Sequence, residues 1–384
     1  MHILFIPSWY PLTPDDLKGK FSREQAIAMA RAGHQVGVLS FHGHTQRRLN
    51  SLGLWSGLLR PSVDKGVQTW RVHHVSGIPG YGRIVLPILA NHYYKKYSQL
   101  HGRPDIIHVQ VALDGGLLAM KLSRLHGINY VVTEHSTAFT SQLISAKSLA
   151  KAKKVFENAK EIIAVSSPLA DCIIKLCGLS KDIKIVPNML NEVFLINQKL
   201  PYQYHNDQFT FLNVAGLSTK KGQDVLIRAF TREFRDKPAQ LLIGGDGEKC
   251  ESLNRLIIEL EMNEQIHMLG KLSMEQVFQY MMQCDAFVLS SLFETFGVVL
   301  IEALACGKPV IATACCGPED IVTPDNGILV EKDSVDALGT AMKKMYNTID
   351  QYNPHEIREH CISKFGEKAV ISSLVEIYKS VLSI

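Results

Sequence analysis

The chain has 384 residues, of which 46% are hydrophobic and 20% are charged, and its formal net charge is +4 at pH 7. This length exceeds what one ordinary hydrophobic core covers, so we expect two domains. The small net charge argues against a nucleic-acid-binding protein, and no stretch approaches the roughly 18 apolar residues of a membrane-spanning helix.

Short apolar runs alternate with helical patterns through the first half of the chain. The predicted strands are Ile3–Ile6, Val36–Leu39, Ile106–Val109, Tyr130–Val132, Ile162–Val165 and Ile183–Val186. Helical patterns lie between several of them, as at Arg23–Ala32 and Gly116–His126. Strands that are apolar throughout are typical of a parallel sheet covered on both faces. We therefore predict a doubly wound, Rossmann-like α/β domain over residues 1–190.

Residues 42–82 break this alternation and look less regular. Basic residues in His44-Thr-Gln-Arg-Arg48 precede Leu52-Gly-Leu-Trp-Ser-Gly-Leu-Leu-Arg60, which combines leucine, tryptophan and glycine. A segment that lies on a membrane surface has this composition, and so does a solvated loop with a few packed apolar side chains. Peripheral membrane contact through residues 44–60 is one prediction, and a solvated loop is the other.

The second half repeats the α/β pattern after a polar, aperiodic stretch from Asn191 to Asp207 that we interpret as a linker. The predicted strands are Phe209–Val214, Gln240–Ile243, Ile266–Leu269, Ala286–Leu289, Val310–Ala312 and Gly327–Val330. They predict a second Rossmann-like domain over residues 205–365, followed by a terminal helix. Two such domains would form a ligand cleft at the carboxyl ends of their sheets.

The eight cysteines show no spacing that indicates disulfides or a metal site, and Cys315 and Cys316 are adjacent. We interpret them as small buried side chains in a reducing compartment. The expected location is the cytoplasm, with the inner face of the cytoplasmic membrane as the alternative.

Three glycine-containing loops follow predicted strands and lead into predicted helices. They are Pro14–Phe21, Ala215–Gly222 and Glu294–Gly297. Backbone N–H groups at such helix starts bind anions, although glycine also serves turn geometry alone. Two of the loops fall in one domain, and one carries Lys220 and Lys221. This combination favours a diphosphate as the ligand.

The carboxylates Glu294 and Glu302 flank the helix start after the third loop. Carboxylates repel phosphate but accept hydrogen bonds from the hydroxyl groups of sugars. Glu302 lies four residues after Val298, on the same helix face, and its apolar neighbours argue against a surface salt bridge. We expect phosphates at the Val298 N–H group, a ribose at Glu302, and Glu294 facing what lies beyond the phosphates.

These residues resemble the signature of the family-4 retaining glycosyltransferases, which have the GT-B architecture of two Rossmann-like domains with a cleft between them. The resemblance extends almost from end to end. Its motifs are Ser8-Trp-Tyr-Pro11, Gly19, Phe21–Ala26, Ala32–Val36, Asp105–His108, Thr133–Ser136, Val165-Ser166, Val186–Asn188, Lys221-Gly222, Gly244–Gly247, Gly270, Glu294–Gly297, Glu302, Ala305–Val310, Gly317 and Gly327.

The resemblance implies roles for individual residues. Glu294 holds the transferred sugar, His135 lies near the reacting carbon, and Lys221 binds the diphosphate. The implied donor-binding residues are Gly19, Gly216, Lys220, Lys221, Lys271, Leu272, Glu294, Phe296, Gly297, Val298 and Glu302. Lys271 and Leu272 would flank the base. The family often has arginine where this chain has Gly216, which removes one phosphate cation.

The resemblance also implies transfer with retention at the anomeric carbon, by front-face attack. No protein nucleophile and no Asp-x-Asp metal site stand out, because Asp15-Asp16 and Asp246 look like turn residues. We expect no metal and no cofactor, since the nucleotide-diphosphate sugar is a substrate, with a UDP-sugar favoured over a GDP-sugar. The acceptor would be a glycan or lipid-linked molecule in cell-surface polysaccharide synthesis. The helix over residues 366–384 would pack back on the first domain.

Two alternatives remain at this point. A sugar-nucleotide epimerase has the same architecture, and a non-catalytic sugar-nucleotide-binding subunit would tolerate the missing cation at Gly216. Glu294, Glu302 and Lys221 together favour the transferase. His135 could also be a locally satisfied histidine, and His108 ranks below it as a candidate.

Overall fold

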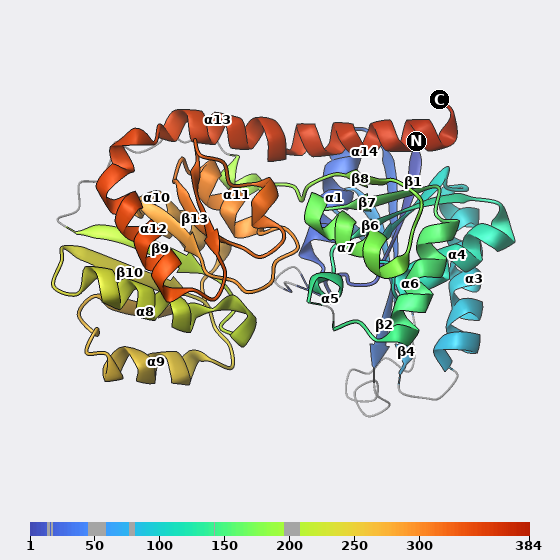
Figure 1. Cartoon of the computed structure of the whole chain (residues 1–384). Helices are drawn as coiled ribbons and strands as arrows, with labels where there is room; N and C mark the ends of the chain where they lie inside the picture. The colour runs from blue at the N-terminus through green and yellow to red at the C-terminus, as the bar shows by residue number, and fades with distance from the viewer. Residues whose placement is uncertain (14–15, 17, 45–58, 77–80, 142, 196–207) are drawn as a thin grey trace. The chain divides into compact units, whose positions relative to one another are not determined.

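The computed structural model describes residues 1–13, 16, 18–44, 59–76, 81–141, 143–195 and 208–384. These residues form two compact units, and each is described by itself. Unit 1 contains Met1–Val165, Ala170–Val186 and Val370–Ile384, and unit 2 contains Ser166–Leu169 and Pro187–Ala369. The first and last segments of the chain, blue and red in Figure 1, therefore belong to the same unit. Most of the predicted membrane-contact segment, residues 45–58, lies outside the described residues.

An eight-stranded sheet forms the centre of unit 1 within the described residues, in the order β3-β4-β2-β1-β5-β6-β7-β8. Its strands are β1 (His2–Pro7), β2 (Gln35–His44), β3 (Leu59–Asp64), β4 (Val67–Val75), β5 (Ile106–Gln110), β6 (Asn129–Glu134), β7 (Glu161–Ala164) and β8 (Ile183–Ile185). Every pair is parallel except β3 with β4. β1 and β5 are buried along their whole length, as expected for central strands covered on both faces.

Helices connect these strands, as the parallel pairing requires. They are α1 (Lys20–Arg31), α3 (Tyr81–His101), α4 (Gly115–His126), α5 (Thr137–Thr140), α6 (Ala146–Asn158) and α7 (Ser167–Cys177). The C-terminal helix α14 (Glu367–Leu382) buries Val370, Leu374 and Tyr378. Its Tyr378 hydroxyl lies 2.5 Å from Nδ1 of His108 on β5, which ties the helix to the sheet of unit 1.

The prediction that residues 42–82 are irregular is wrong for residues 59–75, which form the antiparallel pair β3–β4. Lys65 and Gly66, at φ 47° and 89°, make the turn between the two strands. β4 mixes buried and partly exposed positions instead of being apolar throughout, and it contains polar residues such as Thr69 and His73. A search for continuous apolar runs therefore passes over it.

Unit 2 contains a six-stranded parallel sheet, in the order β11-β10-β9-β12-β13-β14 among the described residues. The strands are β9 (Phe209–Val214), β10 (Ala239–Gly244), β11 (Ile266–Gly270), β12 (Ala286–Leu289), β13 (Val310–Ala314) and β14 (Gly327–Glu331). The helices are α8 (Gln223–Phe234), α9 (Cys250–Glu259), α10 (Met274–Gln283), α11 (Val298–Ala305), α12 (Val335–Thr348) and α13 (Pro354–Phe365). The predicted fold class, two Rossmann-like α/β domains, is confirmed.

Each sheet has a point at which the strand order reverses, and such points are where α/β proteins bind ligands. In unit 2 the reversal lies between β9 and β12, and in unit 1 it lies between β1 and β5. In open α/β sheets the loops that follow the two strands at such a point leave the sheet in opposite directions, and ligands bind between them. The residues with chemistry to offer are therefore expected in these loops.

All eight cysteines are free thiols, as predicted, and five of them are buried. Burial raises the pKa of the Cys177 thiol to about 11 and that of Cys284 to about 12. Such thiols are poor nucleophiles at neutral pH. Within the described residues, no helix combines the length and the apolar character that crossing a bilayer requires.

His108 predicts how the stability of the protein depends on pH. Its side chain is fully buried, and burial lowers its pKa from 6.5 to about 3. Between pH 6.5 and pH 3, His108 is protonated in the unfolded chain but stays neutral in the folded chain. The free energy of unfolding therefore falls as the pH is lowered through this range. From this histidine alone we expect a loss of about 2 kcal/mol between pH 7 and pH 5.

Chemical denaturation at the two pH values measures this loss. In His108→Gln the fall should be smaller by about that amount. His92→Gln, at an exposed position on α3, is the matched control and should keep the wild-type fall. An unchanged fall in His108→Gln would contradict the assignment.

Candidate active site

Two loops of unit 2 meet at the reversal point of its sheet. After β9 the chain passes through the short helix Thr219–Lys221 to Gly222, whose φ is 62°. A Cβ atom on Gly222 would lie 2.3 Å from the carbonyl oxygen of Ser290, so only glycine fits here. The Ser290 hydroxyl donates to the Lys221 carbonyl at 2.9 Å, and the Leu292 N–H donates to the Lys220 carbonyl at 2.8 Å. The loop after β9 is thereby fastened to the loop after β12.

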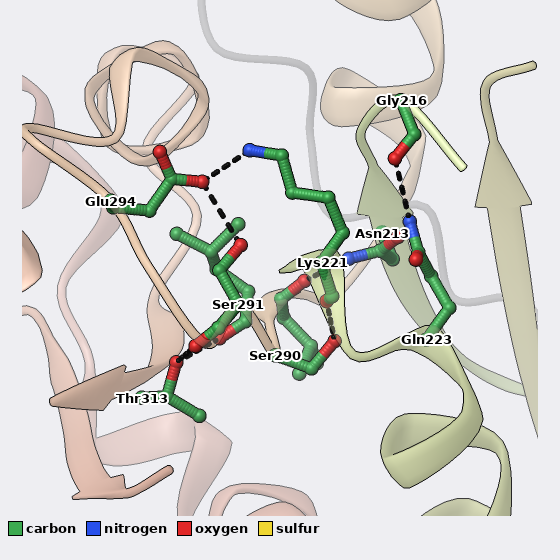
Figure 2. Close-up of polar contacts among 10 residues, drawn as sticks. Asn213, Gly216, Lys221, Gln223, Ser290, Ser291, Glu294 and Thr313 are labelled. Carbon is green, nitrogen blue, oxygen red and sulfur yellow. Dashed lines mark hydrogen bonds and ion pairs between the residues drawn. The ribbon is translucent and has the colours of Figure 1, made fainter. Parts of the chain in front are cut away.

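This arrangement brings the Lys221 amine against the Glu294 carboxylate. Figure 2 shows Lys221 extending to Glu294, and the two side chains form a charge-assisted hydrogen bond. The Ser291 hydroxyl donates to the same carboxylate oxygen at 2.9 Å. Only 19% of the lysine side chain and 12% of the glutamate side chain are exposed. The pair is thus a largely desolvated ammonium and carboxylate. The ammonium could bind a negative group of a ligand, and the carboxylate could accept hydrogen bonds from its hydroxyl groups.

The backbone around Glu294 is fixed by β13 and the turn after it. Glu294 N–H donates to the Cys315 carbonyl at 3.2 Å, and the Glu294 carbonyl accepts from Gly317 N–H at 3.2 Å. A Cβ on Gly317 would lie 2.3 Å from the backbone of Phe296, so the two segments touch. Phe296 is 2% exposed and belongs to the core. The Phe296 side chain therefore packs in the core, and only its backbone could contact a ligand.

Helix α11 begins directly after this turn. Gly297 precedes it in the left-handed region, with φ 100°, and no described side chain caps the helix. Its first-turn N–H groups are therefore a potential anion site. Glu302 lies one turn further along, on the face of Val298, and is 5% exposed. This burial excludes the alternative that Glu302 forms a salt bridge on the surface.

The other predicted donor residues lie on neighbouring loops of unit 2. Lys271 follows β11 and is exposed, whereas Leu272 packs so closely that a Cβ on Gly244 would meet its Cδ1 at 2.5 Å. Lys220 is exposed. Among the described residues, a Cβ on Gly216 would meet only the Asp246 carbonyl oxygen, at 4.0 Å. The space at Gly216 is therefore compatible with a larger side chain.

Sequence reasoning missed four polar residues that hold this site. Ser291 supports Glu294, and the Thr313 hydroxyl donates to the Ser291 carbonyl at 2.5 Å. Asn213, fully buried on β9, donates to the Val288 carbonyl at 2.8 Å and so links β9 to β12. Gln223 donates to the Gly216 carbonyl at 3.3 Å. Their one shared signal is a polar side chain at or just after the carboxyl end of an apolar strand or loop.

His135 lies in unit 1, directly after β6, where the neighbouring Glu134 has a structural role. The Glu134 carboxylate is fully buried and accepts from the N–H groups of Ala112, His135 and Ser136 at 3.0, 2.9 and 2.8 Å. Burial raises its pKa, and these three bonds act in the opposite direction. Glu134 thus fixes the backbone around His135.

The His135 ring is oriented by Gln110, a residue that sequence reasoning did not select. Nε2 of His135 lies 2.6 Å from Oε1 of Gln110, and the ring packs against Phe21 at a centroid distance of 4.1 Å. The Gln110 amide in turn donates to Gln25 at 2.5 Å and lies 3.3 Å from Nε2 of His108. Because the amide oxygen accepts from His135, this contact places the proton of the neutral ring on Nε2.

Gly19 precedes α1 in the left-handed region, with φ 76°. A Cβ there would lie 2.3 Å from the Trp9 carbonyl oxygen, so packing within unit 1 already requires glycine at this position. In the part of the chain that the structure describes, no group of three or more His, Cys, Asp or Glu residues is arranged to hold a metal ion. Asp246 accepts from Gly247 N–H at 2.7 Å, as a turn residue does.

Comparison with known protein families identifies both halves of the chain. Residues 19–192 match the model of Glycosyltransferase Family 4, and residues 198–363 match that of Glycosyl transferases group 1. The chain belongs to glycosyltransferase family 4. It is a glycosyltransferase of the GT-B fold, which confirms the resemblance and favours the transferase over the epimerase and the non-catalytic subunit.

Individual relatives agree with this family. The chain is 36% identical over 195 residues to the uncharacterized glycosyltransferase MJ1059 of Methanocaldococcus jannaschii, a match that covers 48% of this chain and 47% of that protein. It is 27% identical to the putative teichuronic acid biosynthesis glycosyltransferase TuaC of Bacillus subtilis, across 90% of this chain and 89% of the relative. The structure of Anabaena Alr3699/HepE in complex with UDP has a TM-score of 0.78 at 19% identity, covering 99% and 100% of the two chains.

Proposed function

We propose that this glycosyltransferase moves a sugar from a UDP-sugar to a glycan or lipid-linked acceptor, with retention of configuration, in the synthesis of a cell-surface polysaccharide. The observation that carries the donor assignment is the Lys221–Glu294 pair at the reversal point of unit 2, beside the start of α11. Structures of Anabaena Alr3699/HepE hold UDP, and one with a TM-score of 0.74, 19% identical over 99% of this chain and 100% of that one, holds UDP-glucose. The relative TuaC is named for teichuronic acid biosynthesis. Both names support the proposal.

The proposed chemistry follows from the charge that develops on the leaving diphosphate. The Lys221 amine and the N–H groups at the start of α11 would stabilise this charge, an effect often worth several kcal/mol. Glu294 would then accept hydrogen bonds from hydroxyl groups of the transferred sugar. The donor would exchange partners with the existing ion pair, so that neither buried charge is left uncompensated.

The nucleoside part of the donor would lie further along the same unit. Glu302, one turn into α11, suits a ribose, since a carboxylate accepts from two neighbouring hydroxyl groups. Lys271 and Leu272, which follow β11, would flank the base. The position of His135 beside the reacting carbon and the front-face course of the reaction stay predictions from the family resemblance.

Removing either charge of the pair should impair transfer. We expect Lys221→Met and Glu294→Gln each to lower kcat/KM by at least about tenfold, or about 1.4 kcal/mol. The assay is the release of UDP from a panel of UDP-sugars in the presence of lipid-linked acceptors from a membrane extract. Lys344→Met is the matched control, because Lys344 is an exposed lysine on α12 of unit 2, and it should keep wild-type activity. Full activity in both site variants would remove this site assignment.

The open space at Gly216 allows a substitution that should strengthen donor binding. Gly216→Arg should supply a phosphate cation and tighten UDP binding several-fold, because a charge-assisted hydrogen bond at a partly exposed site contributes about 1 kcal/mol. Isothermal titration with UDP measures the change, and Gly216→Ala, which adds bulk without charge, should bind as the wild type does. Unchanged UDP affinity in a folded Gly216→Arg protein would place the phosphates elsewhere.

We also propose that transfer needs no metal ion, because Lys221 and α11 supply the positive charge. Activity in the UDP-release assay should be the same before and after treatment with EDTA. A loss of activity that Mg²⁺ or Mn²⁺ restores would overturn this part of the proposal.

A further inference from the structure

A chain of buried polar side chains crosses unit 1 from helix α14 to His135. The Tyr378 hydroxyl lies 2.5 Å from Nδ1 of His108, and Nε2 of His108 lies 3.3 Å from the amide nitrogen of Gln110. The amide oxygen of Gln110 lies 2.6 Å from Nε2 of His135. We call Tyr378, His108 and Gln110 the buried relay. It ends at the histidine for which the family resemblance predicts a place beside the reacting carbon.

The members of the buried relay have no access to water. Tyr378 and His108 are fully buried, and only 1% of Gln110 is exposed. A buried polar group that loses its partner costs free energy, because no water molecule replaces the partner. A change in one hydrogen bond of the relay therefore has to be compensated by the next one.

Two further side chains limit the arrangements that the relay can adopt. Oγ1 of Thr133 on β6 lies 2.7 Å from Nε2 of His108, and Oε1 of Gln25 on α1 accepts from the Gln110 amide at 2.5 Å. Thr133 and Gln25 are themselves buried. The contact with Gln25 keeps the amide nitrogen of Gln110 away from His135 and its amide oxygen toward that ring.

These contacts assign the protons of the relay. The Gln110 amide nitrogen only donates, so Nε2 of His108 accepts, and the proton of this ring lies on Nδ1 and faces the Tyr378 oxygen. Burial lowers the pKa of His108 to about 3, so the ring is neutral at neutral pH. At the other end, the Gln110 oxygen accepts from Nε2–H of His135. The tautomer of His135 is thereby linked to that of His108.

The Tyr378 oxygen stabilises this arrangement of protons. Without it, Nδ1–H of His108 would be a buried donor that has lost its acceptor. A proton on Nε2 could instead be donated to Thr133 Oγ1, so the other tautomer of His108 would become the more stable one.

This second tautomer of His108 would change the far end of the relay. Its Nε2–H would face the amide nitrogen of Gln110, which is also a donor. The amides of Gln110 and Gln25 would turn over together, and Gln110 would then present its nitrogen to His135. A donor at this position makes Nε2 of His135 the acceptor and leaves the proton of the neutral ring on Nδ1.

We propose that Tyr378, His108 and Gln110 are positioning residues that hold His135 in one orientation and in its Nε2–H tautomer. Helix α14 thereby acts on a residue of the candidate active site without contacting it. The effect on transfer rests on the proposed function, whereas the effect on the tautomer does not.

NMR spectroscopy measures the tautomer directly. The experiment is a long-range proton–nitrogen correlation spectrum of the whole chain with isotope-labelled histidine, and His135→Gln identifies the signals of His135. We expect the Nε2–H tautomer of His135 in the wild type. In Tyr378→Phe, which removes the oxygen and keeps the ring, we expect the Nδ1–H tautomer.

Tyr97→Phe is the matched control, because Tyr97 is another fully buried tyrosine of unit 1 whose hydroxyl contacts a histidine. It lies 2.9 Å from Nε2 of His2 at the amino end of β1, whereas His135 follows the carboxyl end of β6. This variant should keep the wild-type tautomer of His135. An unchanged tautomer in Tyr378→Phe, or the same change in Tyr97→Phe, would overturn the proposal.

Turnover in the UDP-release assay tests whether the relay serves the reaction. We expect Tyr378→Phe to lower kcat about fivefold, the factor that corresponds to one hydrogen bond. The KM for the UDP-sugar should stay the same, because the candidate donor-binding residues other than Gly19 belong to unit 2. Tyr97→Phe should keep the wild-type kcat.

A double-mutant cycle tests whether Tyr378 acts through Gln110. Gln110→Met removes the amide and should lower kcat as well. Adding Tyr378→Phe to Gln110→Met should cause no further loss, because the relay is already interrupted. Independent losses that multiply in the double variant would reject the relay.

The two measurements separate this inference from the proposed function. If the wild type releases no UDP from any UDP-sugar, the proposed donor is rejected, and the NMR spectra still decide on the relay. A changed tautomer of His135 with wild-type kcat would reject the role of the relay in transfer.

Discussion

The contact between Gly222 and the Ser290 carbonyl oxygen is the constraint on which the candidate donor site depends. It allows the loop after β9 to touch the loop after β12, and a Cβ atom at 2.3 Å would separate them. With the loops in contact, the Lys221 amine meets the Glu294 carboxylate, which lies four residues before Val298, the first residue of α11. A side chain at Gly222 would therefore act on the charges of the site through the backbone, without contacting a ligand.

The ion pair also explains how a carboxylate can lie close to the start of α11, whose uncapped N–H groups are a potential anion site. Glu294 and Lys221 neutralise each other, and Ser291 supplies a further hydrogen bond to the carboxylate. A nucleotide sugar carries both complements, negative phosphates and neutral hydroxyl groups, at neighbouring positions.

Local sequence patterns predicted most of the sheet but little of the hydrogen bonding that holds the site. Strands β9 and β12 have the predicted bounds, since a continuous apolar run between polar loops leaves little choice. The β3–β4 pair was missed, because β4 mixes buried with partly exposed side chains and contains buried polar residues such as Thr69 and His73. Lys221 and Glu294 could be selected from their motifs. Gln110 could not, because its role depends on a partner that tertiary structure brings close, His135, 25 residues further along the chain.

Unit 1 can be completed only after helix α14 has been synthesised. Unit 1 contains β1, yet the helix that contributes the buried Val370, Leu374 and Tyr378 to this unit is translated after unit 2. Between Val186 and Val370 the ribosome must produce nearly all of unit 2. At about 5–20 residues per second this takes on the order of tens of seconds. During that interval the apolar surface that α14 covers is exposed in the nascent first unit, and His108 lacks its hydrogen bond to Tyr378. Such a surface is a binding site for a chaperone.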